Sequence, residues 1–75
     1  MKKAQVVELL NEIVASCPAL AVDGFYTREI RSSSAGDLEL RLLGSLDRDS
    51  RKRLSAVIEN RGLRLIEEKN LLIIY

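Results

Sequence analysis

The spacing of apolar residues predicts a helix near the start of the chain. From about Lys3 to Cys17 the apolar side chains recur every three or four positions and fall along one side of a helix. Polar side chains fall on the opposite side, and Pro18 ends the pattern. Cys17 lies on the apolar line, so we expect a small core residue there and not a reactive thiol.

A second amphipathic helix is predicted from about Arg48 to Arg61. Asp and Ser side chains at 47–50 can cap its first turn. Gly62 follows it and can adopt the left-handed conformation that ends many helices. The inward stripe of this helix is supplied by Leu54, Val57 and Ile58.

Four further segments are expected to be strands, joined as two hairpins. The first hairpin connects Phe25–Ser32 to Leu38–Leu43 through turn-forming residues at 33–37. The second connects Leu63–Glu67 to Leu71–Tyr75 through residues 68–70. Leucines alternate with charged residues in Leu38–Leu43, which is typical of a strand with one buried face.

Charge favours one register for the first hairpin. Placing Ile30 opposite Leu40 creates two opposite-charge cross-strand pairs, Glu29–Arg41 and Arg31–Glu39. A shift of the register by two residues would set two glutamates against each other. We therefore predict the first register, which leaves a five-residue loop at 33–37.

These elements predict one α+β domain over residues 1–75, in the order helix, strand, strand, helix, strand, strand. We expect two helices packed on one face of a four-stranded antiparallel sheet. Moving the last strand to the front of the order gives a connectivity that resembles a circularly permuted ferredoxin-like arrangement. The most continuously apolar strand belongs in the middle of the sheet, so the predicted strand order is 3-4-2-1.

Two helices leave the other face of such a sheet open. Strict alternation points Leu63, Leu65, Ile73 and Tyr75 at the helices. It puts Ile66, Leu72 and Ile74 on the open face, with Phe25 or Leu43 as further members. A one-residue slip of the last hairpin would instead expose Leu65 and Ile73.

Leaving several large apolar side chains in water forgoes roughly 1.5–3 kcal/mol for each. We therefore predict that Ile66, Leu72 and Ile74 bind a protein partner, either a second copy of the chain or a different protein. The open sheet face or a strand edge would form the contact. One alternative is that loops at 19–23 and 32–37 cover the patch within one chain; another is that the face binds a small molecule or a nucleic acid.

A basic cluster at the start of the second helix suggests a different function. Cations oppose the helix dipole there, and free backbone N–H groups beside arginines can bind phosphate. Nucleic-acid or phosphate-ligand binding is therefore the alternative function, with strand arginines Arg28, Arg31, Arg41 and Arg64 in support. Asp47 and Asp49 offset part of this charge, so a solvated helix face is the simpler interpretation. The cluster consists of Arg48, Arg51, Lys52 and Arg53.

Composition narrows the classes of function. The 75 residues carry a formal net charge of +1, one cysteine and no histidine. These counts exclude an internal disulfide and a four-ligand Cys/His zinc site, and the commonest acid–base residue of enzymes is missing. We expect no enzyme activity, metal or cofactor. A cytoplasmic location is expected from the cysteine usage, and no membrane contact is expected because no long apolar run occurs.

Overall fold

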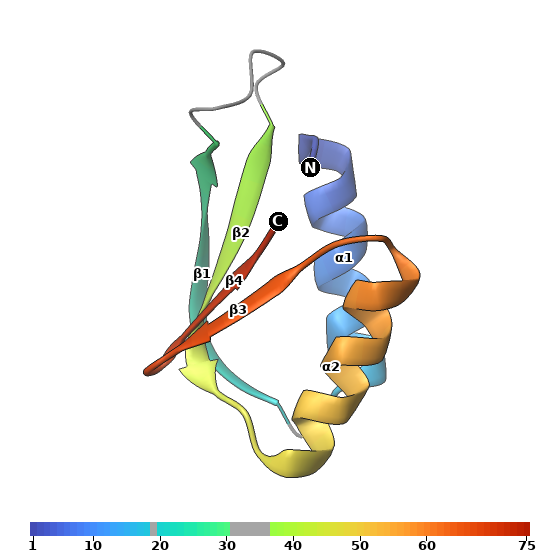
Figure 1. The fold of residues 1–75 in the computed structure, drawn as a ribbon, viewed down its shortest axis with the longest axis vertical. Coiled ribbons are helices and arrows are strands. Elements are labelled where there is room, and N and C mark those ends of the chain that lie inside the picture. The colour runs from blue at the N-terminus through green and yellow to red at the C-terminus, as the bar shows by residue number, and fades with distance from the viewer. Residues whose placement is uncertain (19, 31–36) are drawn as a thin grey trace.

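The computed structural model describes residues 1–18, 20–30 and 37–75. It contains two helices and four strands in the predicted order α-β-β-α-β-β (Figure 1). The elements are α1 (Lys3–Ser16), β1 (Ala21–Glu29), β2 (Leu38–Ser45), α2 (Arg48–Asn60), β3 (Leu65–Glu68) and β4 (Leu71–Ile74). Neither described helix has the length and apolar character needed to cross a membrane.

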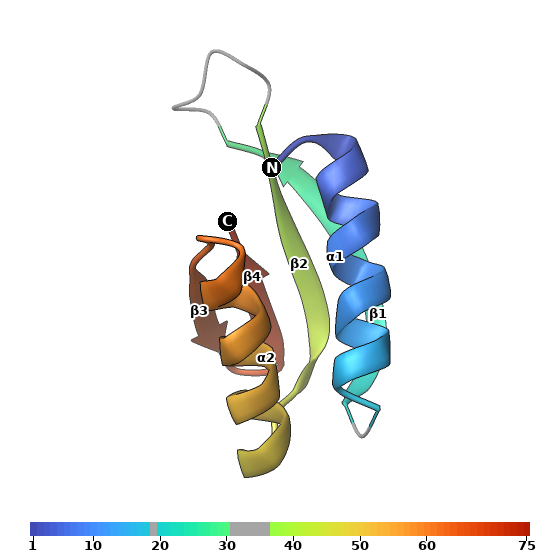
Figure 2. The same ribbon diagram turned by 90° about the vertical axis from the view of Figure 1, so that its right-hand side faces the viewer.

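The strands form one antiparallel sheet in the order β1-β2-β4-β3, which confirms the predicted topology. The last strand in the chain therefore pairs on both sides, with β2 and with β3. Both helices cover the same face, with α1 in front of β1 and β2 and α2 in front of β3 and β4 (Figure 2). Among the described residues, no helix or strand covers the opposite face of the sheet.

The predicted register of the first hairpin is wrong. Leu40 lies opposite Thr27 and not opposite Ile30, so the cross-strand pair Glu29–Arg41 does not form. The expected partner of Glu39, Arg31, lies outside the described residues. Glu39 and Arg41 occupy the same face of β2 two residues apart and pair with each other at 2.9 Å. The observed register also sets Arg28 opposite Glu39, so opposite charges across the two strands do not distinguish it from the predicted register.

The strand β1 also starts earlier than predicted, at Ala21. Asp23 and Gly24, both poor strand formers, suggested a loop at this point. The sheet accommodates them through a bulge between Val22 and Gly24, in which the extra residue is Asp23. At the other end of the hairpin, the backbone N–H of Ile30 donates to the carbonyl oxygen of Asp37 at 2.9 Å.

Local signals fix both ends of α2. The Asp47 side chain accepts a hydrogen bond from the backbone N–H of Ser50 at 2.7 Å, as expected for a cap. Gly62 adopts the left-handed conformation with φ 68°. Its N–H donates to the carbonyl of Glu59, and the N–H of Leu63 donates to the carbonyl of Ile58, both at 3.0 Å. This pair of bonds is a Schellman motif, which satisfies carbonyl groups that the helix leaves free.

The core lies between the helices and the sheet. Cys17 is 3% exposed within it, as predicted, and burial raises the pKa of its thiol. Each helix contributes one apolar stripe, and the two central strands contribute the facing layer. The other core residues are Val6, Leu9, Ile13, Leu40, Leu42, Leu54, Val57, Ile58, Leu72 and Ile74.

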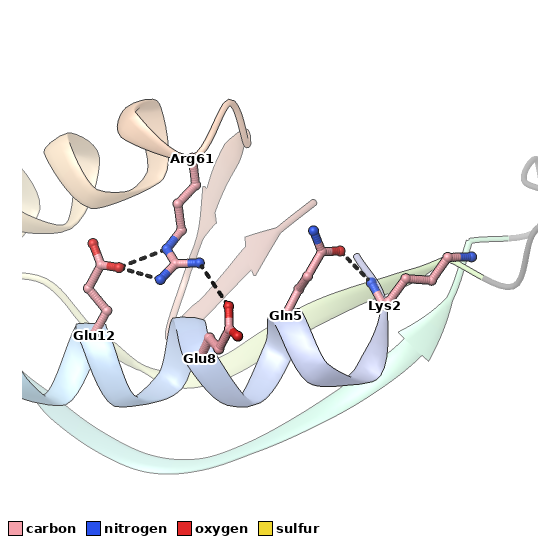
Figure 3. Close-up of polar contacts among 5 residues, drawn as sticks. All are labelled: Lys2, Gln5, Glu8, Glu12 and Arg61. Carbon is pink, nitrogen blue, oxygen red and sulfur yellow. Dashed lines mark hydrogen bonds and ion pairs between the residues drawn. The ribbon is translucent and has the colours of Figure 1, made fainter.

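One arginine connects the two helices at the surface. Arg61, at the end of α2, extends toward α1 and reaches two of its glutamates (Figure 3). Its Nε donates to Glu12 Oε2 at 2.8 Å, and Nη1 lies 4.0 Å from Glu8 Oε2. At the start of α1, the Gln5 side chain accepts a hydrogen bond from the backbone N–H of Lys2 at 2.8 Å. These contacts are exposed, so each contributes roughly 1 kcal/mol or less to stability.

Candidate interaction surface

The three residues predicted to bind a partner lie on two different faces of the sheet. Ile66 lies on the open face and is 42% exposed, as predicted. Leu72 and Ile74 are 1% and 0% exposed and belong to the core beneath the helices. Their predicted placement on the open face is wrong. Ile73 takes that face instead, whereas Leu65 packs against the core.

The length of the last turn explains this error. Glu68 pairs with Leu71, so the turn contains only Lys69 and Asn70 and not the three residues expected. Asn70 permits this tight turn because it adopts a left-handed conformation with φ 58°. Each even-numbered residue of β3 consequently lies opposite an odd-numbered residue of β4. The pairing of β3 with β4 is therefore shifted by one residue from the predicted pairing, and this shift moves each residue of β4 to the other face of the sheet.

The open face is apolar along two rows that cross the sheet. The first row is formed by directly paired residues, namely Ile66, Ile73, Arg41 and Tyr26. The second row is Glu68, Leu71, Leu43 and Gly24. We define the open-face patch as the large apolar and aromatic side chains of both rows. These are Tyr26, Leu43, Ile66, Leu71 and Ile73. Tyr26, Leu43 and Ile66 are 44%, 41% and 42% exposed, whereas Leu71 is half-buried and Ile73 is 7% exposed.

Glycine keeps one end of this patch flat. A Cβ atom added to Gly24 would lie 3.7 Å from Leu43 Cδ1, which is ordinary contact distance. Because Gly24 has no side chain, it leaves the neighbouring Leu43 side chain uncovered. Of the residues that sequence reasoning offered for this face, Leu43 is present and Phe25 is not. Tyr26 and Leu71 were missed, because the register of each strand decides which face they occupy.

The two charged groups at the centre of the open face, Glu39 and Arg41, are paired with each other. The guanidinium of Arg41 lies 2.8 Å from the Glu39 carboxylate, and both side chains are 18% exposed. Arg41 Cζ also lies 6.0 Å from the centre of the Tyr26 ring, within cation–π range. Hydrogen bonding to the Tyr26 side chain and then to Glu39 raises the pKa of Arg41. The centre of the face therefore presents a neutral ion pair beside apolar side chains.

Phe25 contributes to a second apolar surface on the helix side of the sheet. It is 57% exposed and lines a cleft of about 520 Å³ between α1 and β1. Val7, which is 54% exposed, lines the same cleft from α1. The remaining lining residues are Lys3, Val6, Leu10, Asn11, Thr27 and Leu38.

The basic cluster of α2 is partly engaged in structural contacts. Arg51 forms a bidentate ion pair with Glu67. Its Nε donates to Oε2 at 2.9 Å and its Nη2 donates to Oε1 at 2.6 Å. This contact lowers the pKa of Glu67 and raises that of Arg51. The Asp47 carboxylate occupies the helix N-terminus, where a phosphate would have to bind. The other three cations, Arg48, Lys52 and Arg53, are exposed on the same turn and a half of the helix.

The described residues contain no group of three or more His, Cys, Asp or Glu side chains that could hold a metal ion. No protein-family model matches the chain, and neither the curated proteins nor the solved structures contain a match. The surfaces described above are therefore the features of the molecule from which a function can be inferred.

Proposed function

We propose that this chain is a small, non-catalytic interaction module that associates with a second copy of itself through the open-face patch. The observation that carries the proposal is that three large side chains on one sheet face, Tyr26, Leu43 and Ile66, are each more than 40% exposed. Burying such apolar area favours association by about 25 cal/mol per Å². Sheets packed in this way interdigitate their side chains at a spacing of about 10 Å.

A second copy suits the centre of this face because the Glu39 and Arg41 charges there are already paired with each other. At the centre of an approaching identical face, this copy would meet the Glu39–Arg41 pair. Burial of an unpaired charge would cost several kcal/mol, whereas an internal pair keeps its partner on desolvation. The free, buried Cys17 supports placing the module in the reducing cytoplasm.

The test compares the molar mass of three proteins by light scattering over a range of micromolar concentrations. The unaltered chain should exceed the mass of one copy, 8.4 kDa. Leu43→Lys places a charge in the patch and should lower the mass. Val14→Lys is the control, because Val14 is 73% exposed on α1, on the other side of the molecule. A single-copy mass for the unaltered chain at high micromolar concentration, or an unchanged mass for Leu43→Lys, would overturn the proposal.

A further inference from the structure

The strand β3 forms one edge of the sheet and can pair with another strand. Arg64 and Tyr75 exchange two backbone hydrogen bonds, of 2.7 and 3.0 Å, across the β3–β4 hairpin. In an antiparallel ladder such pairs alternate with pairs that make no bonds to each other. The N–H and C=O groups of Leu65 and Glu67 therefore point away from β4, toward the open edge.

The charges along this edge are self-complementary. On the open-face side of β3, a cation at Arg64 and an anion at Glu68 lie on either side of Ile66. A twofold rotation about Ile66 brings each charge against the opposite charge of a second copy. The edge therefore has the pattern that a cross-strand pair of identical strands requires.

The helix α2, which lies over this edge, also has a cation and an anion on either side of a central residue. Arg51, Ser55 and Glu59 follow one another at one-turn spacing, so a cation and an anion flank a small residue. The Arg51–Glu67 contact ties this side of α2 to β3. The helix and the strand run in opposite directions (Figure 2). The centres of their two patterns therefore lie near each other along the edge.

We propose that two copies pair through their β3 edges, antiparallel, with Ile66 opposite Ile66 and Arg64 opposite Glu68 of the second copy. In this register the outward groups of Leu65 and Glu67 bond to one another across the twofold axis. A shift that centres the pair on Glu67 places two carboxylates face to face. A shift that centres it on Leu65 places Arg64 opposite Ile66 and loses both ion pairs.

A cleft beside the edge adds a further complementary contact. It measures about 400 Å³ and is lined by residues that include Glu59 and Leu63. The proposed register brings Lys69 of the second copy opposite Leu63. This places Lys69 of the second copy beside the cleft to which Glu59 and Arg64 contribute.

The opposite edge of the sheet lacks these features. On the open-face side of β1, Tyr26 is flanked by Gly24 and Arg28, which are not opposite charges. The bulge at Asp23 also interrupts the edge, and bulges limit pairing with other strands. The pairing is therefore assigned to β3.

This pairing deepens the proposed function, on which the following step rests. Four strands about 4.8 Å apart present a small face, whereas a stable interface needs about 800 Å² from each partner. Edge pairing joins two patches, because Ile66 of one copy then lies beside Ile66 of the other. The paired copies would present one continuous apolar band to a second pair, so four copies form when both contacts are made.

Swapping the charges at positions 64 and 68 tests the proposed pairing. Arg64→Glu and Glu68→Arg each set like charges opposite one another at two places in the pair. Each single variant should therefore weaken the edge pairing by about tenfold or more. The double variant restores opposite charges, so its assembly should return to that of the unaltered chain. An equimolar mixture of the two single variants should form mixed pairs, detected by native mass spectrometry. Arg28→Glu, on the β1 edge, is the matched control.

The outcomes separate this pairing from the proposed function. The pairing is overturned if the single variants assemble like the unaltered chain, or if neither the double variant nor the mixture recovers assembly. Leu43→Lys should remove the contact between faces and leave pairs of copies. If Leu43→Lys reduces assembly and Arg64→Glu does not, the proposed function stands and the edge pairing fails. If only Arg64→Glu reduces assembly, the edge pairing stands and the open-face contact fails.

Discussion

Ile66 of β3 lies directly opposite Ile73 of β4, and this pairing decides which apolar residues of the last hairpin are buried. Because neighbouring residues of a strand point to opposite faces, Leu72 and Ile74 must then point toward the helices. Of the apolar residues of β3 and β4, the pair itself and the half-buried Leu71 remain for the open face. One two-residue turn therefore determines the composition of both the core and the interaction surface.

The first prediction tests this facing through stability. Leu72→Ala should lower the free energy of unfolding by about 2–5 kcal/mol, since it creates a cavity at a residue that is 1% exposed. Leu43→Ala, on the open face, should change it by about 0.5 kcal/mol or less in a single copy. Urea denaturation at low protein concentration measures both. Equal effects of the two substitutions would contradict the assigned facing.

The second prediction concerns the end of α2. Gly62→Ala should destabilise the protein by about 1–2 kcal/mol, because a Cβ atom disfavours the left-handed conformation that this residue adopts. No atom lies within 4 Å of the added Cβ, so the cost is one of backbone conformation and not of a clash. Gly24→Ala provides the comparison, since its added Cβ makes only ordinary contact. Thermal or urea unfolding should show a clear loss for Gly62→Ala alone.

The third prediction is a loss of stability in acid. Hydrogen bonds from Ser50 lower the pKa of Asp47 from its ordinary value of 3.8, and a hydrogen bond from Arg51 lowers that of Glu67 from 4.5. Since both pKa values are lower in the folded protein, the unfolded chain takes up these protons first as the pH falls. Their contribution is complete above the ordinary values and is lost as the pH falls below them.

Substitution isolates this acid effect. Asp47→Asn and Glu67→Gln should each make the free energy of unfolding less dependent on pH below about pH 4 to 5. Denaturant titrations between pH 2 and 7 would measure the slopes. Asp49→Asn is a matched control, because Asp49 lies in the same turn but does not accept the hydrogen bond that caps the helix. Slopes identical to that of the unaltered protein would refute the assignment.

The fourth prediction uses Cys17 as a reporter of unfolding. The thiol is buried and its pKa is raised, so it should react with a thiol reagent far more slowly than a free cysteine does. Reaction should require opening of the core, and its rate should rise in step with the unfolded fraction in denaturant. Fast labelling of the native protein would show that the packing around Cys17 opens readily.

The elements and their order follow from the sequence because their signals are local. The helical period of residues 3–17, the cap at Asp47 and the stop at Gly62 each act within one or two turns. The central place of the last strand also follows, because its unbroken apolar character requires burial from both sides. These features do not depend on how distant segments align.

The candidate surface was only partly predictable from the sequence. Which residues face each other on paired strands depends on weak cross-strand contacts and on the length of the turn, and neither produces a clear pattern along the sequence. Cross-strand ion pairs contribute roughly 0.2–1 kcal/mol each, and Glu39 found Arg41 on its own strand instead. Both faces of β4 are apolar, so its side-chain pattern does not distinguish Leu72 from Ile73. Asn70 was the available signal, because its tolerance of positive φ favours a two-residue turn. The contact between Arg51 and Glu67 joins separate elements and had no local signal.

The place of β4 in the sheet also has a consequence for synthesis. The segment from α1 to β2 emerges from the ribosome with one side of β2 unpaired, because β4, which fills that position, follows every other element along the chain. Leu40 and Leu42 cannot be enclosed until that strand arrives. The two central strands therefore come from distant parts of the chain, and the sheet can be completed only after β4 has been synthesised.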